Sequence, residues 1–297
     1  MSRTPPAEVD LDSAVVAALI ADQCPDLAHL PVSPMGNGWD NYMFSVGDQY
    51  VARLPRREVA VELLEHERIY LPQLADGLPI PTPAFIYAGK PGHGYPWPWL
   101  LIPKFAGNNP DREELLPEAA PQLAGFLCAL HRPDDGPKEN RAPANSHRGV
   151  PLINRDETLK QGWQIMVDKG EPLTPELVAL WEKAKHLPPP EIPVWLHGDL
   201  HYANVLVHKG MFSAIVDWGD ICSGDPATDL AAFWLFFDDA DARQAGLNAY
   251  GLDAELRLRA MGWALSFSTI LLSTGIGDNP RHAQAGREGL KRLLQDF

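Results

Sequence analysis

The sequence predicts an α+β fold with two lobes, a small β-rich N-lobe and a larger, mostly helical C-lobe. Short strand-like runs bounded by turn residues concentrate before residue 102, and longer segments with helical apolar spacing dominate after it. The chain has 297 residues, enough for one large domain or for two lobes with a sizeable core. We therefore assign the N-lobe to residues 1–102 and the C-lobe to residues 108–297, with the segment 103–107 connecting them.

The composition is that of an ordinary soluble globular protein, with 45% hydrophobic and 22% charged residues. No apolar run is long enough to cross a bilayer. The N-terminus lacks the basic and apolar segments of a signal peptide. These features predict a cytoplasmic protein without a membrane partner.

The net charge of −14 argues against a nucleic-acid partner, because a phosphate backbone needs a basic surface. Residues 210–242 contain seven Asp and neither Lys nor Arg. Such a segment predicts an acidic rim that attracts a cationic small molecule. Surface acid that serves only solubility is the alternative interpretation. We expect a monomer.

The N-lobe opens with a predicted helix and a glycine-containing turn. Residues 10–23 carry apolar side chains at helical spacing. Gly36 and Gly38 then lie in a turn before two strand-like runs at 42–46 and 49–54. Glycines in such a turn would let the backbone approach a phosphate closely, although a Gly-x-Gly pattern alone more often marks only a turn.

A helix and two more strands complete the predicted N-lobe. Residues 58–75 are predicted to form the helix. The proline-rich segment 78–83 ends this helix and is predicted to be an extended connection. Strands at 84–88 and 98–102 would then complete a five-stranded sheet.

The C-lobe is predicted to consist mainly of helices. Residues 134–154 are rich in Pro, Gly, Asn and charge, which indicates a long surface loop. Helical spacing predicts helices at 122–132, 155–168, 175–186, 228–237, 253–273 and 280–294.

The densest group of polar residues follows a short strand at 194–196. Asp199 and Asn204 lie five residues apart in a loop, and two apolar runs at 205–207 and 212–216 lead to Asp217. Lys209-Gly210 between these runs predicts a β-hairpin. Because a hairpin returns the chain to its start, Asp217 should lie beside Asn204 and Asp199. Phosphoryl transfer needs such a cluster of oxygen ligands and a carboxylate base.

Three sequence blocks carry a family resemblance. They are His197-Gly198-Asp199-Leu200-His201-x-x-Asn204, Val216-Asp217-Trp218-Gly219-Asp220 and Gly224-Asp225-Pro226-Ala227-Thr228-Asp229-Leu230-Ala231. In this order and at this spacing they resemble the aminoglycoside phosphotransferase family, from about Gly36 to the C-terminal helices. The resemblance implies a two-lobed, protein-kinase-like fold.

The resemblance also implies catalytic roles. Asp199 would be the catalytic base that orients the acceptor hydroxyl and receives its proton. Asn204 and Asp217 would bind Mg²⁺ on the phosphates of ATP or GTP. His197 would brace the loop, and Asp229 would accept hydrogen bonds from its backbone.

The nucleotide site would lie between the lobes. Gly36 and Gly38 would cover the phosphates. The base edge would meet the backbone of residues 103–107, which resemble the hinge between the lobes in this family. Arg53 occupies the place where kinases have a phosphate-binding Lys, which is a departure from the family pattern. Arg can still bind a phosphate and pair with a carboxylate, so the departure does not exclude the same role. Glu67 would pair with it. Ile102 and Phe105 would supply apolar walls for the base.

Three further aspartates are candidates for binding the acceptor. Asp220 follows Asp217 by three residues and would face either the substrate or a second metal ion. Asp238 and Asp239 could bind the ammonium groups of an amino sugar, or they could be a solvated helix end.

The resulting hypothesis is a small-molecule O-phosphotransferase that moves the γ-phosphoryl group of ATP or GTP to a hydroxyl of an aminoglycoside-type antibiotic and so confers resistance. A macrolide, a peptide antibiotic or a small metabolite alcohol is the alternative acceptor. Asn204 disfavours the macrolide branch, whose members often carry His there. A non-catalytic nucleotide-binding regulator is the third possibility, and only the Arg53 departure supports it.

Overall fold

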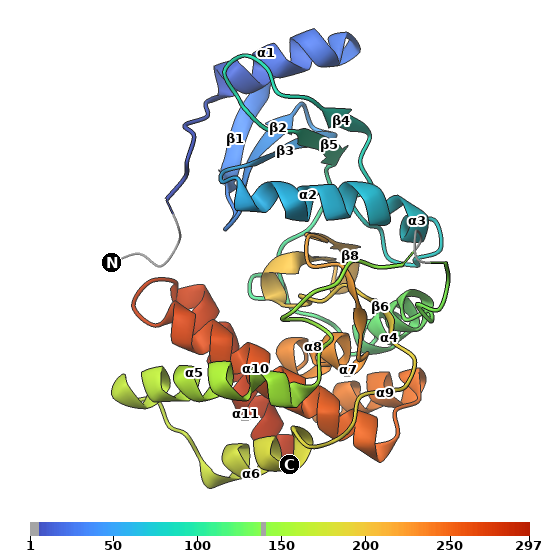
Figure 1. The fold of residues 1–297 in the computed structure, drawn as a ribbon, viewed down its shortest axis with the longest axis vertical. Coiled ribbons are helices and arrows are strands. Elements are labelled where there is room, and N and C mark those ends of the chain that lie inside the picture. The colour runs from blue at the N-terminus through green and yellow to red at the C-terminus, as the bar shows by residue number, and fades with distance from the viewer. Residues whose placement is uncertain (1–5, 138–140) are drawn as a thin grey trace.

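The computed structural model describes residues 6–137 and 141–297. A five-stranded sheet with two long helices lies at one end of the molecule, and a larger group of helices lies at the other (Figure 1). This architecture confirms the predicted α+β, two-lobed fold. No helix in the described ranges combines the length and apolar character that a membrane span requires.

The sheet is antiparallel throughout and has the strand order β1-β2-β3-β5-β4. Its first strand includes Gly36, in the segment where the sequence predicted a glycine turn. A bulge between Pro34 and Gly36 shifts the pairing register of β1 on β2. The strands are β1 Val32–Asn37, β2 Asn41–Val46, β3 Tyr50–Pro55, β4 Tyr87–Gly89 and β5 Trp99–Pro103.

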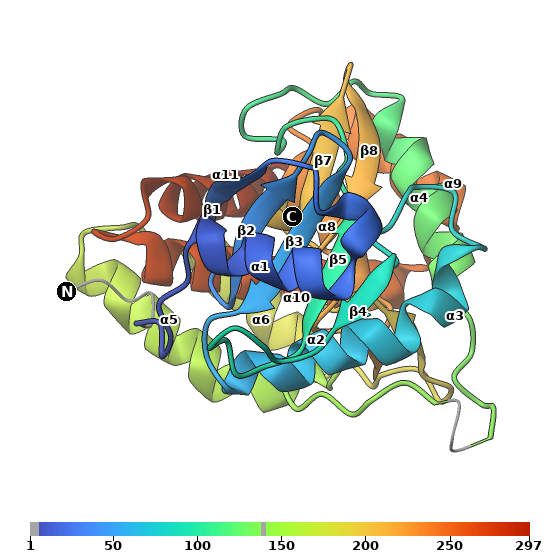
Figure 2. The same ribbon diagram turned by 90° about the horizontal axis from the view of Figure 1, so that it is seen from above.

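One helix covers each face of this sheet. Helix α1 (Ser13–Gln23) lies across the strands on the outer side, where it packs in an apolar cluster with β2, β3 and β5 (Figure 2). Helix α2 (Val59–Tyr70) lies on the inner side, which faces the helical lobe (Figure 1). The single helix predicted at 58–75 is wrong, because Pro72 lacks an N–H and starts a separate short helix, α3 (Pro72–Ala75).

The chain passes from the sheet to the helical lobe through a short extended segment. Lys104 still hydrogen-bonds to the backbone of Gln49, and Asn108 then exchanges two backbone hydrogen bonds with Val207, at 2.8 and 2.7 Å. Gly107 between them has φ +127°, and a Cβ there would lie 2.4 Å from the Val207 carbonyl oxygen. We therefore propose residues 103–107 as the hinge.

The helical lobe is built around α10, which packs against α5, α6, α7 and α11. Fifteen of its 22 residues are buried. The helices of this lobe are α4 Ala119–Leu130, α5 Asp156–Asp168, α6 Pro175–Ala184, α7 Ala227–Leu230, α8 Ala232–Phe236, α9 Ala240–Tyr250, α10 Ala254–Gly275 and α11 Pro280–Asp296. The lobe also has 3₁₀ turns at Leu152–Arg155 and Tyr202–Asn204, and a third 3₁₀ turn, Pro25–Leu27, follows α1 in the sheet lobe.

Two details of this lobe differ from the predictions. The helix predicted at 228–237 is interrupted at Ala231, where the Trp234 N–H donates to the Ala231 carbonyl and tightens the turn. Helix α9 was not predicted, although the Asp239 side chain caps its start and Gly251 ends it with φ +88°.

Four short strands carry the polar cluster. Strand β6 (Val194–Leu196) pairs with β9 (Cys222–Gly224), and β7 (Val205–His208) pairs with β8 (Met211–Ile215). Lys209 and Gly210 both have positive φ, as a tight two-residue hairpin turn requires. The predicted hairpin is therefore confirmed, and its two ends lie together.

Candidate active site

Asp199 and Asn204 contact each other directly in the loop between β6 and β7. The Asn204 side-chain amide donates to the Asp199 backbone carbonyl at 2.9 Å and to its carboxylate Oδ2 at 3.1 Å. A 3₁₀ turn at Tyr202–Asn204 brings the chain back on itself and makes these contacts possible. The five-residue spacing thus serves to join an amide to a carboxylate.

The hairpin brings Asp217 to the same place. The backbone N–H of Val216 donates to the Asn204 carbonyl at 2.8 Å, so Asp217 follows directly after a residue bonded to Asn204. Asp217 has φ +62°, a left-handed conformation that is uncommon outside glycine and often marks functional sites. Its side chain is about half exposed, at 53%.

A buried ion-pair chain connects Asp217 to the sheet lobe. The Arg53 guanidinium on β3 bonds to Glu67 on α2 through Nη1 and to Asp217 through Nη2. Glu67 also accepts from the Trp218 backbone N–H at 3.1 Å. Burial alone would lower the pKa of Arg53, but the Asp217 and Glu67 carboxylates outweigh it and raise that pKa, so the guanidinium stays charged.

His197 and Asp229 hold the loop that carries Asp199. The Asp229 carboxylate accepts the backbone N–H groups of His197 and Gly198 at 2.8 and 2.9 Å. The His197 ring accepts from the Asp199 N–H at Nδ1, so its Nε2 must donate to the Val216 carbonyl, 3.0 Å away. The fully buried His197 ring therefore joins the Asp199 loop to the strand that leads to Asp217.

Gly198 is required by this geometry. It has φ +86°, and a Cβ there would lie 2.5 Å from the Asp220 carbonyl oxygen. We expect Gly198→Ala to lower the free energy of unfolding by about 1–3 kcal/mol through backbone strain, with a further loss from the clash, and to reduce turnover by displacing Asp199.

Gly170→Ala is the matched control. Gly170 has φ +79°, but in the described part of the chain no neighbouring atom lies within 4 Å of the position that a Cβ would take there. Urea unfolding of both variants separates strain from steric overlap. Equal losses of stability in the two variants would contradict the close approach at Gly198.

Arg148 is the main site residue that the sequence did not predict. It lies in the segment 134–154, which was expected to be a surface loop, and its Nη2 donates to Asp199 Oδ1 at 2.6 Å. Burial alone would raise the pKa of Asp199, but Arg148 and His201 outweigh it and hold that pKa well below its usual range. Nothing in the local pattern marks Arg148, because its partner lies 51 residues away along the chain.

The side chains of Asn204 and Asp217 are suited to bind a hard cation. Both supply oxygen ligands, which Mg²⁺ prefers, and a nucleotide-bound Mg²⁺ needs only one or two protein carboxylates. The Asn204 Nδ2 points to Asp199, so its amide oxygen is not used in that contact. In the described ranges, no three His, Cys, Asp or Glu side chains form a metal-binding group. Any cation here would therefore depend on the Asp217 carboxylate, the Asn204 amide oxygen and the phosphate oxygens of a nucleotide.

The predicted nucleotide residues lie on the sheet lobe. Gly36 and Gly38 are exposed at the β1–β2 connection, and Gly36 has φ +133°, which side-chain-bearing residues rarely adopt. Ile102 is buried with Val51 in a small apolar cluster on the α2 side of the sheet. Phe105, in the proposed hinge, is half-buried. Their contacts with a nucleotide remain predictions.

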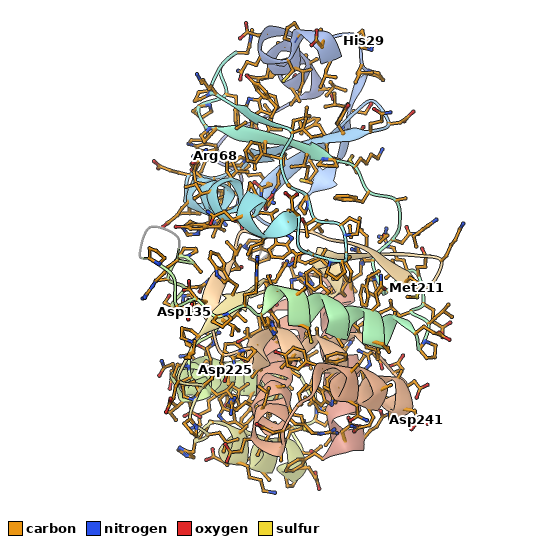
Figure 3. All side chains as sticks on the ribbon, turned by 90° about the vertical axis from the view of Figure 1, so that its right-hand side faces the viewer. His29, Arg68, Asp135, Met211, Asp225 and Asp241 are labelled. Carbon is orange, nitrogen blue, oxygen red and sulfur yellow. The ribbon has the colours of Figure 1, made fainter. Side chains whose placement is uncertain are left out.

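The three acidic candidates for acceptor binding do not lie together. Asp220 lines a cavity beside Asp199 and accepts from the Asn145 side chain at 2.9 Å. Asp238 and Asp239 line a different cavity, where Asp238 pairs with Arg292 at 2.7 Å and Asp239 caps α9. Figure 3 shows Asp225 and Asp241 toward opposite sides of the helical lobe, so the acid-rich segment forms no single rim.

Solved structures of similar fold include several antibiotic phosphotransferases. A GDP and kanamycin complex of APH(2")-IIia has 22% sequence identity and a TM-score of 0.67, with 95% of this chain and 97% of that chain covered. The apoenzyme of the macrolide 2'-phosphotransferase MphH from Brachybacterium faecium has 21% identity and a TM-score of 0.59, with 94% and 97% covered. At these identities the likeness establishes the fold. No curated protein matches the chain in sequence.

The family assignment comes from the sequence blocks that build the site. The model of the phosphotransferase enzyme family, APH, matches residues 31–262, which include the sheet, the hinge and the Asp199, Asn204 and Asp217 cluster. This range is well over half of the 297 residues. The chain therefore belongs to the phosphotransferase enzyme family.

Proposed function

We propose that this protein transfers the γ-phosphoryl group of ATP or GTP to a hydroxyl of a small molecule. The observation that carries the proposal is the contact of Asp199 with Asn204 at the start of a hairpin whose other end holds Asp217. The Arg53–Glu67 pair extends this cluster into the sheet lobe. A base, two oxygen ligands and a phosphate-binding cation are the parts that phosphoryl transfer requires.

Each residue then has a definite task. The Asp199 carboxylate orients the acceptor hydroxyl and receives its proton as the new oxygen–phosphorus bond forms. The bond from the γ-phosphorus to the bridging oxygen breaks, and the nucleoside diphosphate leaves. Asn204 and Asp217 would hold Mg²⁺, which supplies positive charge to the phosphates when bound. Arg53 would contact the phosphates while Glu67 fixes its orientation.

The class of the acceptor is a separate question. Structural neighbours in complex with kanamycin and with gentamicin support an aminoglycoside acceptor, whose modification would confer resistance. Phosphorylation would weaken such a drug by adding negative charge to a cation. A macrolide acceptor is supported by the MphH likeness. A non-catalytic regulator is disfavoured, because Arg53 forms the ion pairs expected of the residue at its position.

Acceptor-dependent release of nucleoside diphosphate tests the proposal. We expect turnover that requires Mg²⁺ with at least one member of a panel of aminoglycosides, macrolides, sugars, sugar acids and sugar phosphates, assayed with ATP and with GTP. Turnover should vanish when the cation is chelated. Tight nucleotide binding without turnover on any acceptor would overturn the enzymatic proposal in favour of a regulator.

A further inference from the structure

A second cavity lies beside Asp199 on the helical lobe. It has a volume of about 470 Å³, and its walls come from the loop before α5, from α5 and α10, and from Asp220. Helices α5 and α10 pack side by side below the sheet lobe (Figure 1). Arg148 lines this cavity and also contacts Asp199 at 2.6 Å, so one side chain connects the cavity to the proposed base.

The charged residues of this cavity are mainly cationic. Arg148 and Arg155 line it together with His147, and Asp220 is the only carboxylate among its described lining residues. The Arg148 guanidinium also lies 4.0 Å from the Asp220 carboxylate, so a cation already faces that acid. The cavity lined by Asp238 and Asp239 has the opposite character, with five acidic residues and two arginines.

Arg155 differs from the other buried arginines of the described chain. It is only 6% exposed, yet no carboxylate of the described residues lies within ion-pair distance. The other four each pair with a carboxylate: Arg53 with Glu67 and Asp217, Arg243 with Asp296, Arg259 with Asp225, and Arg292 with Asp238. A buried charge without a counter-charge is costly, so it requires a functional or structural reason.

The hydrogen bonds of Arg155 leave one edge of its guanidinium without a partner. Nη1 contacts Nδ1 of the His147 ring at 3.2 Å, and this is its one hydrogen bond among the described residues. Within residues 6–137 and 141–297, the buried Nε has no hydrogen-bond partner. The Nε and Nη2 edge of an arginine is the one that binds a carboxylate or a phosphate with two parallel hydrogen bonds. Burial and the nearby Arg148 lower the pKa of Arg155, an effect that an incoming anion would reverse.

We propose that the acceptor carries an oxyanion, a carboxylate or a phosphate group, which binds Arg155 while the accepting hydroxyl of the same molecule faces Asp199. This inference rests on the proposed phosphotransferase function and names its acceptor class. Arg148 lines the same cavity as Arg155 and contacts Asp199, so it connects the two points. A polycationic aminoglycoside would instead place ammonium groups beside Arg148 and Arg155, where like charges repel.

The binding test compares a neutral sugar with two anionic sugars and a cationic aminoglycoside. Glucose, glucuronate, glucose 6-phosphate and kanamycin would be titrated calorimetrically against the full chain, with a nonhydrolysable ATP analogue filling the nucleotide site. We expect at least one of the two anionic sugars to bind about 10-fold or more tightly than glucose. Arg155→Met should abolish that preference, and Arg155→Lys should restore part of it. The preferred anion distinguishes a carboxylate from a phosphate.

A stability test needs no ligand. Arg155→Met removes an uncompensated charge, so its melting temperature should equal or exceed that of the wild type. Arg259→Met is the matched control, because it removes a buried arginine that pairs with Asp225 at 2.7 Å and should lower the melting temperature. Destabilisation by Arg155→Met equal to that by Arg259→Met would make Arg155 structural and overturn the inference.

The two proposals fail in different ways. Turnover of kanamycin that Arg155→Met leaves unchanged would support the phosphotransferase and overturn the anionic acceptor. Anion binding that depends on Arg155, without turnover on any acceptor, would support the anion site and overturn the enzymatic proposal. The inference would also be overturned if Arg155→Met changed the affinity for neither of the two anionic sugars.

Discussion

Asp199→Asn is expected to reduce kcat by about 10²–10⁴-fold, the range typical of losing a general base. Asparagine keeps the size of the side chain and can still accept the Asn204 hydrogen bond, but it cannot take the proton of the acceptor hydroxyl. It also leaves Arg148 without the carboxylate that lies 2.6 Å away. Nucleotide affinity should change little, because the proposed phosphate contacts come from other residues. Two quantities are measured for the variant and the wild type: the rate of acceptor-dependent release of nucleoside diphosphate, and the dissociation constant of ATP.

Asp111→Asn is a matched control for this change. Asp111 has a partly exposed carboxylate paired with an arginine, Arg281, at 2.6 Å, and it lines the other cavity. Turnover by this variant should stay near that of the wild type. A kcat for Asp199→Asn within a few-fold of the wild-type value would remove Asp199 from the role of base.

Arg53→Met is expected to have the largest effect on stability. The variant leaves Glu67, which is 1% exposed, without its counter-charge, and loss of one partner of a buried ion pair costs about 3–5 kcal/mol. It also removes the proposed phosphate contact, so nucleotide affinity should fall. Urea unfolding at pH 7 and ATP titration measure the two effects.

Two further variants serve as controls for Arg53→Met. Arg57→Met breaks an ion pair with Asp40, in which the Arg57 side chain is 19% exposed and the Asp40 side chain 25%. We expect this variant to lower the free energy of unfolding by about 1 kcal/mol or less. Arg53→Lys keeps the charge but loses the planar fork that reaches two carboxylates, and it should fall between wild type and Arg53→Met. Equal losses for Arg53→Met and Arg57→Met would show that the Arg53 network contributes no more than a surface pair.

The sequence predicted the Asp199 cluster because the relevant signals are local. A two-residue turn at Lys209-Gly210 and two apolar runs were sufficient to fold the hairpin, and a hairpin necessarily returns Asp217 to Asn204. The pairing of Arg53 with Glu67 was implied by the family resemblance, and the structure contains this ion pair. The break in the helix predicted at 58–75 falls at Pro72, a local signal that the prediction did not use.

By itself the sequence determined the family through its three motif blocks, and the family implies the two-lobed fold. It also determined that Asp217 returns to Asn204 and Asp199, because this depends on the short-range pattern of a hairpin. Only the tertiary structure decided what surrounds the proposed base. It placed Arg148 and Arg155, from a loop with no regular pattern, beside Asp199, and it placed Asp238 and Asp239 around a different cavity. Net charge and local acid content are sums along the chain, whereas the charge that a substrate meets depends on which side chains the packing of α5 and α10 brings to one cavity.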